Sequence, residues 1–569
     1  MKNPGLGGLQ SASTRDDSWL QTVYGWLTTS ATTSNLVGLI GGVFALFLLL
    51  AMPEPWNIRL PLYLAVTIWT ILRPRMALYL LPLAVPWGSL DTLDVGGLHL
   101  TSADILVVLL VAGWLGSFVL RPGRFTAIGA SAGPRDHDSF NVPTYLVVTM
   151  FALLCVMLLS MGVAVNISSS FKEISKWLEF LAVILLGAQY IRTRRQVWTL
   201  IVIILLAGIS QAFQGYIQAF FNLGPEAFIR AASLRVYGTF DQPNPYAGYI
   251  NMSLSIALAL MLLGCNRTTR LLGGLATILL GTAEYLAQSR GGEISITAVL
   301  IFILVVGMPQ LRTLTRLVII GGLGIVEAFL AGWIPAHVLT PVLRILGLTQ
   351  ISFTAPSPED YSTAERLAHW IAGIHMFLDH PILGVGIGNY PDAYPKYAIT
   401  IFTLPLGHAH NYYINIAAET GFIGLVVYLL FLLAIFVAAV RAYRGIHNKY
   451  MQAQAQAIRQ GPRPEIEAPL GTGNKLRLLL HPFRMAEHYR AQGIFGIVDK
   501  LTNDRALAVG ILAALLSVCI HNMVDDLYVH SMTNLFALLF VALIRLEGVT
   551  PRVSAITGGQ FDYIEHGKS

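Results

Sequence analysis

The sequence predicts an all-α protein that crosses a membrane many times, and three observations support this prediction. Of the 569 residues, 55% are hydrophobic and only 12% are charged, whereas soluble proteins carry about 25% charged residues. Apolar runs near the ~20 residues that span a bilayer recur along the whole chain. Basic residues concentrate in alternate segments between these runs, as they do in membrane proteins. A large soluble protein with an apolar core would not show this arrangement.

The apolar runs indicate about 14 membrane-spanning helices, within a range of about 12–14, by length and hydropathy. They lie near residues 35–52, 60–72, 76–88, 102–120, 143–163, 174–191, 197–219, 244–263, 271–288, 292–308, 317–334, 412–440, 506–523 and 530–547. The second and third runs are short and contain proline, so their ends are the least defined. The first 33 residues are polar and mixed, so we expect the first helix to be a retained anchor.

The distribution of basic residues predicts the orientation. If the N-terminus lies in the cytoplasm and the spans alternate, 28 of the 37 lysines and arginines face the cytoplasm and nine face outward. This asymmetry follows the positive-inside rule, and the even number of spans places the C-terminus in the cytoplasm too. The net charge of +6 is then explained by topology, and we expect no nucleic-acid partner. The three scattered cysteines form neither a disulfide framework nor a zinc spacing.

These spans divide the chain into seven segments. Residues 1–34 form a cytoplasmic tail, 35–334 contain helices one to eleven, and 335–411 form a long extracytoplasmic loop before the twelfth helix at 412–440. Residues 441–505 form a basic cytoplasmic loop, 506–547 contain the last two helices, and 548–569 form a second cytoplasmic tail. The outer loop has apolar residues at helical spacing from Leu367 to Leu378. The inner loop has a basic amphipathic segment, Lys475 to Arg490, which predicts a helix on the anionic inner leaflet.

Polar clusters at the outer ends of the spans are the candidates for a functional site, because charges near a membrane are costly and usually functional. Four clusters qualify: Arg235 to Asn244, Ser289 to Gly292 around Arg290, Glu365 with Arg366, and His408 to Asn411 around His410. Each has a structural interpretation as well. The arginines could lie at the lipid headgroups or pair with a glutamate, and Asn244 could cap a helix. The two histidines could be loop residues or a metal pair.

Taken together, the clusters favour an anionic ligand. Converging arginines suit a phosphate or diphosphate, because the guanidinium group forms paired hydrogen bonds with such anions. A histidine beside them suits proton transfer near neutral pH. No carboxylate or further histidine follows at a metal-ligand spacing, so we expect no metal and no cofactor.

Other residues are weaker candidates for substrate contact. They are Asn244, His408 and Asn411 from the clusters, then Lys172, Lys176, Gly386, Gly388 and Asn389. The lysines could instead pair with neighbouring glutamates on their own helix. The glycines would let backbone amides approach a ligand closely. The last outer turn, from His521 to Asp526, is interpreted as a solvated rim, with acceptor binding as the alternative.

The four clusters, in this order, resemble the O-antigen ligase and polymerase superfamily. From His410-Asn411, nine residues lead to Gly421 and two more to Gly424. This pattern is similar to the family signature of histidine, a polar residue, nine residues, glycine, two residues, and glycine, threonine or tyrosine. Residues 379–390, 235–244 and 289–292 also look like elements of that family, so that the resemblance covers residues 230–440.

The resemblance implies a metal-independent, GT-C-like glycosyltransferase with its active site on the periplasmic side of the inner membrane. The implied donor is a glycan on undecaprenyl diphosphate, and the acceptor is a lipid, a glycan or a protein. Such enzymes build lipopolysaccharide and other polysaccharides of the cell envelope. By their matching positions, Arg235 and Arg290 would bind the diphosphate, and Arg366 would close over it. His410 would activate an acceptor hydroxyl for inverting attack.

Two alternatives remain open. A polymerase of the same superfamily would extend a repeat-unit chain rather than ligate it once. A transporter or flippase of envelope precursors would carry polar residues at mid-membrane in two related halves. The polar residues of this chain instead gather at the outer rim, with Glu284 as an exception, which favours an enzyme.

Overall fold

The computed structural model describes residues 56–90, 92–95, 98–119, 142–230, 233–331, 353–354, 356, 361–399, 401–459 and 493–551. These belong to two compact units, Met1–Ser139 and Phe140–Ser569. The predicted first span at 35–52, most of the outer loop before residue 361, the basic segment at 475–490 and nearly all of both tails lie outside the described residues.

Among its described residues, the first unit contains three α-helices and a hairpin. The helices are α3 (Trp56–Leu72), α4 (Arg75–Trp87) and α5 (Ser102–Val119), and strands β1 (Thr92–Val95) and β2 (Leu98–Thr101) pair antiparallel between α4 and α5. Helix α5 packs closely on the turn between α3 and α4, where Gly113 lies against Pro74 and Ile71. The predicted runs at 60–72, 76–88 and 102–120 are therefore helical, and the hairpin was not predicted.

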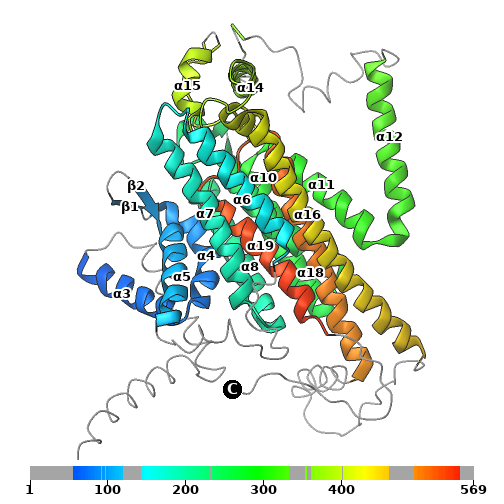
Figure 1. The fold of residues 1–569 in the computed structure, drawn as a ribbon. Coiled ribbons are helices and arrows are strands. Elements are labelled where there is room, and N and C mark those ends of the chain that lie inside the picture. Colours follow the sequence, from blue (N-terminus) through cyan, green and yellow to red (C-terminus); the bar gives the residue numbers. More distant parts are fainter. Residues whose placement is uncertain are drawn as a thin grey trace, which may run out of the picture. The chain divides into compact units, whose positions relative to one another are not determined.

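The second unit is a bundle of long helices (Figure 1). In chain order its described helices are α6 (Thr144–Met161), α7 (Ile167–Tyr190), α8 (Arg194–Phe221), α9 (Pro243–Leu263), α10 (Arg267–Ala287), α11 (Arg290–Gly307), α12 (Arg312–Leu330), α14 (Tyr361–Asp379), the short α15 (Tyr390–Tyr397), α16 (Tyr412–Arg459), α18 (Gly493–His521) and α19 (Met532–Val549). A hairpin of two short strands, β3 (Ile229–Arg230) and β4 (Ser233–Leu234), precedes α9. Helices α9, α18 and α19 form the buried centre. Side chains of Asn166, Thr193, Asn266 and Ser289 cap the starts of α7, α8, α10 and α11, as these residue types favour.

Seven of the described helices are long and apolar enough to cross a membrane: α6, α8, α9, α11, α16, α18 and α19. Large apolar side chains point outward on several of them, including Phe151, Leu206 and Leu433, where lipid rather than water would solvate them. The chain is thus a polytopic membrane protein built from α-helices. Shorter apolar helical stretches lie at Leu60–Leu72, Ser102–Ser117 and Arg316–Ile325. The number of fourteen spans stays a prediction.

Helix α16 corrects two predicted boundaries. It does not end at residue 440 but continues to Arg459, and α18 begins at Gly493 rather than near 506. The extensions pack together through Ala453, Ala457 and Leu501. The 48 residues of α16 would measure about 72 Å at 1.5 Å per residue, well beyond the ~30 Å hydrocarbon core. The polar, Gln-Ala-rich sequence after 440 suggested a loop, although alanine and glutamine both favour helix.

Helix α16 also contains a sharp break. Gly421 has φ +68° and ψ −166°, which only glycine adopts readily. A Cβ atom there would collide with the carbonyl oxygen of Ile382 in the loop after α14. The break frees carbonyls of the preceding turn, and those of Ala418 and Glu419 accept the N–H groups of Val385 at 2.9 Å and Gly386 at 3.0 Å. The loop after α14 is therefore attached to the break.

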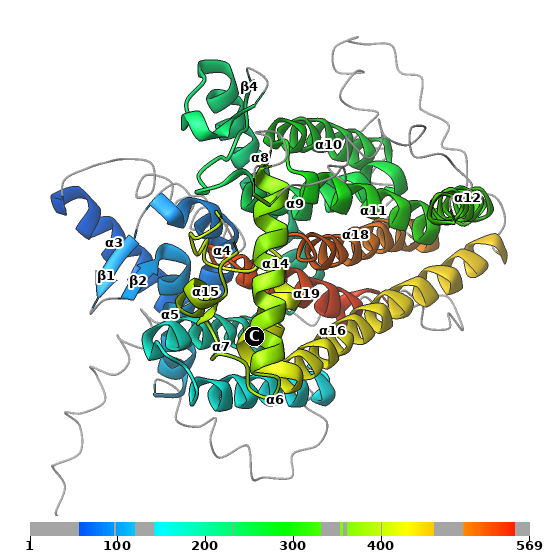
Figure 2. The ribbon, with the colours of Figure 1, turned by 90° about the horizontal axis from the view of Figure 1, so that it is seen from above.

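Helix α14 lies across one end of the bundle. It is seen end-on in Figure 1 and lengthwise in Figure 2, over the ends of the long helices. Its indole at Trp370 donates to the carbonyl of His410, just before α16, at 3.0 Å. We call this end of the bundle the site face, because the candidate residues gather beneath α14.

Candidate functional site

Five segments that are distant in sequence meet at the site face. They are the starts of α9, α11 and α16, the middle of α14, and the turn between α18 and α19. The N–H of Tyr412 donates to the carbonyls of Asn522 and Asp525 at 2.9 and 3.2 Å, which joins α16 to that turn. Gly291 lies against the ring of His521 without room for a side chain, which joins α11 to it as well. All four predicted clusters thus come together, with the 521–526 turn among them.

The backbone of His410 is fixed in an unusual conformation. It has φ +51°, the left-handed region that residues other than glycine seldom adopt. Two hydrogen bonds support this conformation: its carbonyl accepts from Trp370 at 3.0 Å, and its N–H donates to Nδ1 of His408 at 3.0 Å. Such backbone outliers persist only where the surroundings hold them, and they are frequent at active sites.

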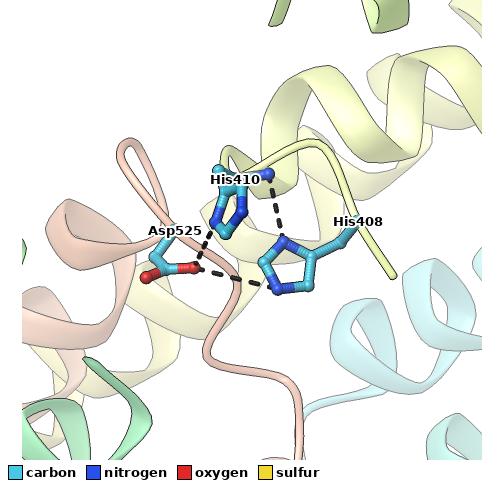
Figure 3. Close-up of side chains that lie close together, drawn as sticks. All are labelled: His408, His410 and Asp525. Atoms are coloured by element: carbon cyan, nitrogen blue, oxygen red, sulfur yellow. Dashed lines mark hydrogen bonds and ion pairs between the residues drawn. The ribbon is translucent and has the colours of Figure 1, made fainter. Parts of the chain in front are cut away.

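Asp525 contacts both histidines from the opposite side (Figure 3). Its Oδ1 lies 3.2 Å from Nδ1 of His410 and 3.8 Å from Nε2 of His408. Because an ionised carboxylate only accepts hydrogen bonds, His410 carries its proton on Nδ1 and keeps its lone pair on Nε2. His408 accepts the His410 N–H at Nδ1, so its neutral ring carries the proton on Nε2. His410 therefore has a defined tautomer with Nε2 ready to accept a proton.

Burial and charge set the protonation of this group. Burial by itself would raise the pKa of Asp525, but the hydrogen bond from His410, and the charge that this ring carries when protonated, hold that pKa well below its usual range. Burial lowers the pKa of His408 to about 3, and a protonated His410 acts in the same direction. Burial also lowers the pKa of His369, whose ring lies edge-on to His410, to about 4. At neutral pH, Asp525 is therefore ionised, while His408 and His369 are neutral.

Arg235 and Asn244 form a buried pair beside the start of α11. The guanidinium of Arg235 donates to Oδ1 of Asn244 at 3.1 Å and to the carbonyl of Ala287 at 3.1 Å. The hydroxyl of Ser289, which caps α11, donates to the same Asn244 oxygen at 3.1 Å. The predicted residues Arg235 and Asn244 thus act as one unit that adjoins Arg290, the first residue of α11.

Arg366 belongs to α14, and Arg290 contacts the first turn of that helix. Arg290 donates to the hydroxyl of Thr363 at 2.7 Å, and Arg366, one helical turn later, acts electrostatically on Asp525 and His521. The imidazole of His521 is buried, and neither of its nitrogens has a hydrogen-bond partner among the described residues. Buried polar atoms without partners are unusual, and here they belong to a ring that lies against Gly291, the neighbour of Arg290.

The side chain of Asn411 is engaged as a helix cap. Its Oδ1 accepts from the N–H groups of Tyr413 and Ile414 at 3.0 and 3.1 Å, and its Nδ2 donates to the carbonyl of Met523 at 2.8 Å. It therefore positions the start of α16 against the 521–526 turn. This geometry favours a structural role over the predicted substrate contact.

The glycine-rich loop is bonded to the protein itself. The N–H of Gly386 is taken by the break in α16, and Gly388 lies against the carbonyl of Ser169 with no room for a side chain. The Asn389 amide accepts from the N–H of Asn166 at 2.6 Å and donates to its carbonyl at 3.2 Å. These contacts favour a structural role for Gly386, Gly388 and Asn389, and their contact with substrate stays a prediction.

The two lysines of α7 differ from each other. Lys176 pairs with Glu173 at 2.6 Å and donates to the carbonyl of Tyr528 at 2.9 Å. This is the pairing within the helix that the sequence left open, and it anchors α7 to the turn before α19. Lys172 is exposed on the same helix, and its contact with substrate stays a prediction.

The sequence missed Asp525 and His521 as central residues. Both were interpreted as rim residues, yet both are buried. Asp525 lies 115 residues from His410 along the chain, so no local spacing connects the two. The sequence offered no carboxylate at a metal-ligand spacing from the histidines, and Asp525 supplies one in the fold. The expectation that the histidines bind no metal therefore loses this support.

An apolar cavity lies beside Asn411, between α14 and α16. It measures about 310 Å³ and is lined mainly by the second half of α14 and the first turns of α16, with Met523 from the last turn. Asn411, the neighbour of His410, lies on its wall. Its size is at the lower end of the ~300–1,000 Å³ typical of ligand pockets.

These features define a polytopic membrane protein with a polar site at one end of its helices, where arginines, histidines and a carboxylate meet. Residues 275–429 match the family model described as O-antigen ligase. The match confirms the resemblance to that superfamily and supports a glycosyltransferase of the ligase or polymerase type, acting in a membrane on lipid-linked glycans. It includes Arg290, Arg366 and His410, whereas Arg235 and Asp525 lie outside the matched residues. No curated protein matches the chain.

Proposed function

We propose that the protein transfers a glycan from undecaprenyl diphosphate to an acceptor hydroxyl on the outer face of the inner membrane, as an O-antigen ligase does. One observation carries this proposal: the hydrogen-bonded pair of His410 and Asp525 lies beneath a helix that also holds Arg366 and contacts Arg290. A base and anion-binding groups in one buried place suit displacement of a diphosphate.

The reaction forms one bond and breaks one. The acceptor oxygen attacks the anomeric carbon, and Nε2 of His410 takes the hydroxyl proton. The bond from that carbon to the diphosphate oxygen breaks on the opposite face, so that the configuration inverts and the electron pair leaves with undecaprenyl diphosphate. Asp525 stabilises the imidazolium that forms. A positioned base of this kind contributes typically about 10²–10⁴-fold.

Arginines would stabilise the leaving group. Arg290 and Arg366, with Arg235 behind them, offer positive charge to a diphosphate that gains charge in the transition state. The unpartnered nitrogens of His521 offer further contacts. The apolar cavity beside Asn411 would accept an apolar part of one of the lipid substrates. Transfer by this route needs no divalent metal.

The orientation follows from charge. The end of the bundle opposite the site face carries many arginines and lysines on or next to the described helices: Arg192, Arg194, Arg195, Arg267, Arg270, Arg444, Lys449, Arg459, Lys500, Arg505 and Arg545. By the positive-inside rule, that end faces the cytoplasm. We therefore propose that residues 335–411 are extracytoplasmic, that 441–505 and both termini are cytoplasmic, and that about 14 spans form a GT-C-like frame.

A transfer assay tests the proposal. The purified protein, supplied with lipid-linked glycan and acceptor, should release undecaprenyl diphosphate and form one glycan–acceptor bond per turnover. Polymer ladders instead of single additions would reassign the protein as a polymerase. Uptake of labelled precursor by proteoliposomes without any glycan product would replace the enzyme by a transporter.

A further inference from the structure

Three side chains at the site form a compact set of metal-ligand types. His408, His410 and Asp525 each offer one nitrogen or oxygen, and these atoms all lie within 4.8 Å of one another. Figure 3 shows both rings facing the same carboxylate. The aspartate comes from a turn 115 residues away, so the fold, rather than a local motif, assembles the set.

Two of the three ligand distances are close to those of a tetrahedral zinc site, and the two nitrogens lie within 4.8 Å of each other. With bonds of about 2.0–2.1 Å, two ligand atoms of a tetrahedral site lie about 3.3–3.4 Å apart. Oδ1 of Asp525 lies 3.2 Å from Nδ1 of His410 and 3.8 Å from Nε2 of His408. Small shifts of the rings would therefore suffice. Two imidazoles and a carboxylate suit Zn²⁺ and similar ions better than Mg²⁺ or Ca²⁺, which prefer oxygen ligands.

We propose that His408, His410 and Asp525 bind a divalent transition-metal ion, best matched by Zn²⁺, and that the metal-bound enzyme is inactive. The binding half of this proposal stands on the ligand geometry alone. The inhibition half rests on the proposed function, in which His410 accepts the proton of the acceptor hydroxyl.

The protons explain why a bound metal would inhibit. A metal on Nδ1 of His410 replaces the proton that Nδ1 donates to Asp525. A neutral imidazole keeps one proton, which then resides on Nε2, and the ring has no lone pair left for the acceptor hydroxyl. The carboxylate of Asp525 is bound to the same metal and no longer stabilises an imidazolium. The ion thus binds Nδ1 and removes the basicity of Nε2 on the other side of the ring. It inhibits without blocking substrate binding.

His408 must change its hydrogen bond to join the site. When its Nε2 binds the metal, its proton moves to Nδ1 and the 3.0 Å bond from the His410 N–H is lost. Gly407 precedes it at φ +89°, with open space where a Cβ atom would lie, so neighbouring atoms leave the backbone room to turn on that side. The surrounding charges act on a bound metal ion in opposite directions. Arg366 and Lys176 disfavour it, whereas Glu365, which interacts with His410, favours it.

Direct binding of Zn²⁺ to the purified full-length protein in lipid nanodiscs tests the first half. Calorimetry should give one site per chain, and Co²⁺ in place of Zn²⁺ should give the visible absorption of a four-coordinate site. Loss of an outer partner of a metal ligand costs about 10–100-fold in affinity, and loss of a ligand should cost at least as much. His408→Ala and Asp525→Asn should each weaken binding by that factor. His380→Ala, which removes an exposed histidine of the same outer loop, should leave the affinity unchanged.

Transfer assays with and without Zn²⁺ test the second half. Zn²⁺ should inhibit the wild type, a chelator should restore the rate, and the concentration for half inhibition should match the dissociation constant. An affinity that His408→Ala and Asp525→Asn leave unchanged would overturn the site, and full turnover by the Zn²⁺-loaded enzyme would overturn the inhibition. Failure of the proposed function looks different: the wild type would then bind Zn²⁺ but transfer no glycan even after chelation.

Discussion

The glycine-rich loop and the histidine segment 408–411 are both candidates for the site, and the structure uses them differently. Both are short loop segments that precede α16. In the loop, the N–H of Gly386 and the amide of Asn389 bond to the protein's own backbone. In the histidine segment, the ring of His408 accepts the backbone N–H of His410, the ring of His410 bonds to Asp525, and His410 keeps a basic nitrogen. Sequence spacing therefore identifies both segments as candidates. Only their hydrogen-bond partners show which segment is structural and which carries the catalytic residue.

The sharpest test of this difference is His410→Ala. We expect transfer to fall by about 10²–10⁴-fold, because a positioned general base contributes that much. Initial rates with purified protein and lipid-linked glycan measure the loss, and size-exclusion profiles and thermal melting control for folding. A folded variant with wild-type turnover would remove the base from the mechanism and make the histidine segment a scaffold like the loop.

Asp525→Asn should have the next largest effect. The amide keeps the shape of the side chain but no longer stabilises an imidazolium. Hydrogen bonds to charged groups contribute about 1.5–3 kcal/mol, so we expect kcat to fall by about 10–100-fold with little change in KM for the donor. A change confined to KM would instead indicate that Asp525 contacts the substrate.

Arg290→Lys probes the anion site with the charge retained. Lysine lacks the planar pair of donors that binds phosphate, and we expect kcat/KM to fall by about tenfold, near the 1.4 kcal/mol of one good hydrogen bond. Arg194→Lys is the matched control. It removes a guanidinium that pairs with Asp504 at 2.8 Å, on the opposite end of the bundle, and should leave transfer unchanged. Equal losses in both variants would point to a general effect on folding.

Gly386→Ala should change stability rather than chemistry. Gly386 has φ +105° and lies against Ala164 with no room for a side chain. A strained backbone of this kind costs about 1–3 kcal/mol. The melting temperature should fall, while kcat per folded molecule stays at the wild-type value. A normal melting temperature together with a lower kcat would return the loop to the substrate-binding site.

The helices were the most predictable part of the structure. Runs such as 143–163, 197–219 and 244–263 agree with α6, α8 and α9 to within a few residues, because apolar length is a local property of the chain. The end of α16 was missed because a polar sequence suggests a loop, even where its residues favour helix. Hydropathy measures solvation by lipid and does not register a helix that continues beyond the membrane.

The site was predictable in part. The arginine and histidine clusters were found from the cost of charge near a membrane, and the fold does bring Arg290, Arg366 and His410 together. Asp525 was not found, because its contact with His410 depends on how α16 packs against α18. A turn with two adjacent aspartates gives no local sign that one of them is buried against a distant ring.

Because α16 breaks at Gly421, the number of residues between His410 and Gly421 sets an angle around the helix axis. His410 and Gly421 are separated by a nearly continuous stretch of helix, so the residues between them fix how far the loop contact is rotated from the histidine. One inserted residue would turn Gly421 by about 100° around the axis and shift it by about 1.5 Å, away from the carbonyl of Ile382. Seven inserted residues, close to two full turns, would nearly restore the direction but move the contact by about 10 Å. The nine-residue interval thus fixes both a rotation about the helix axis and a rise along it, and no insertion preserves the two together.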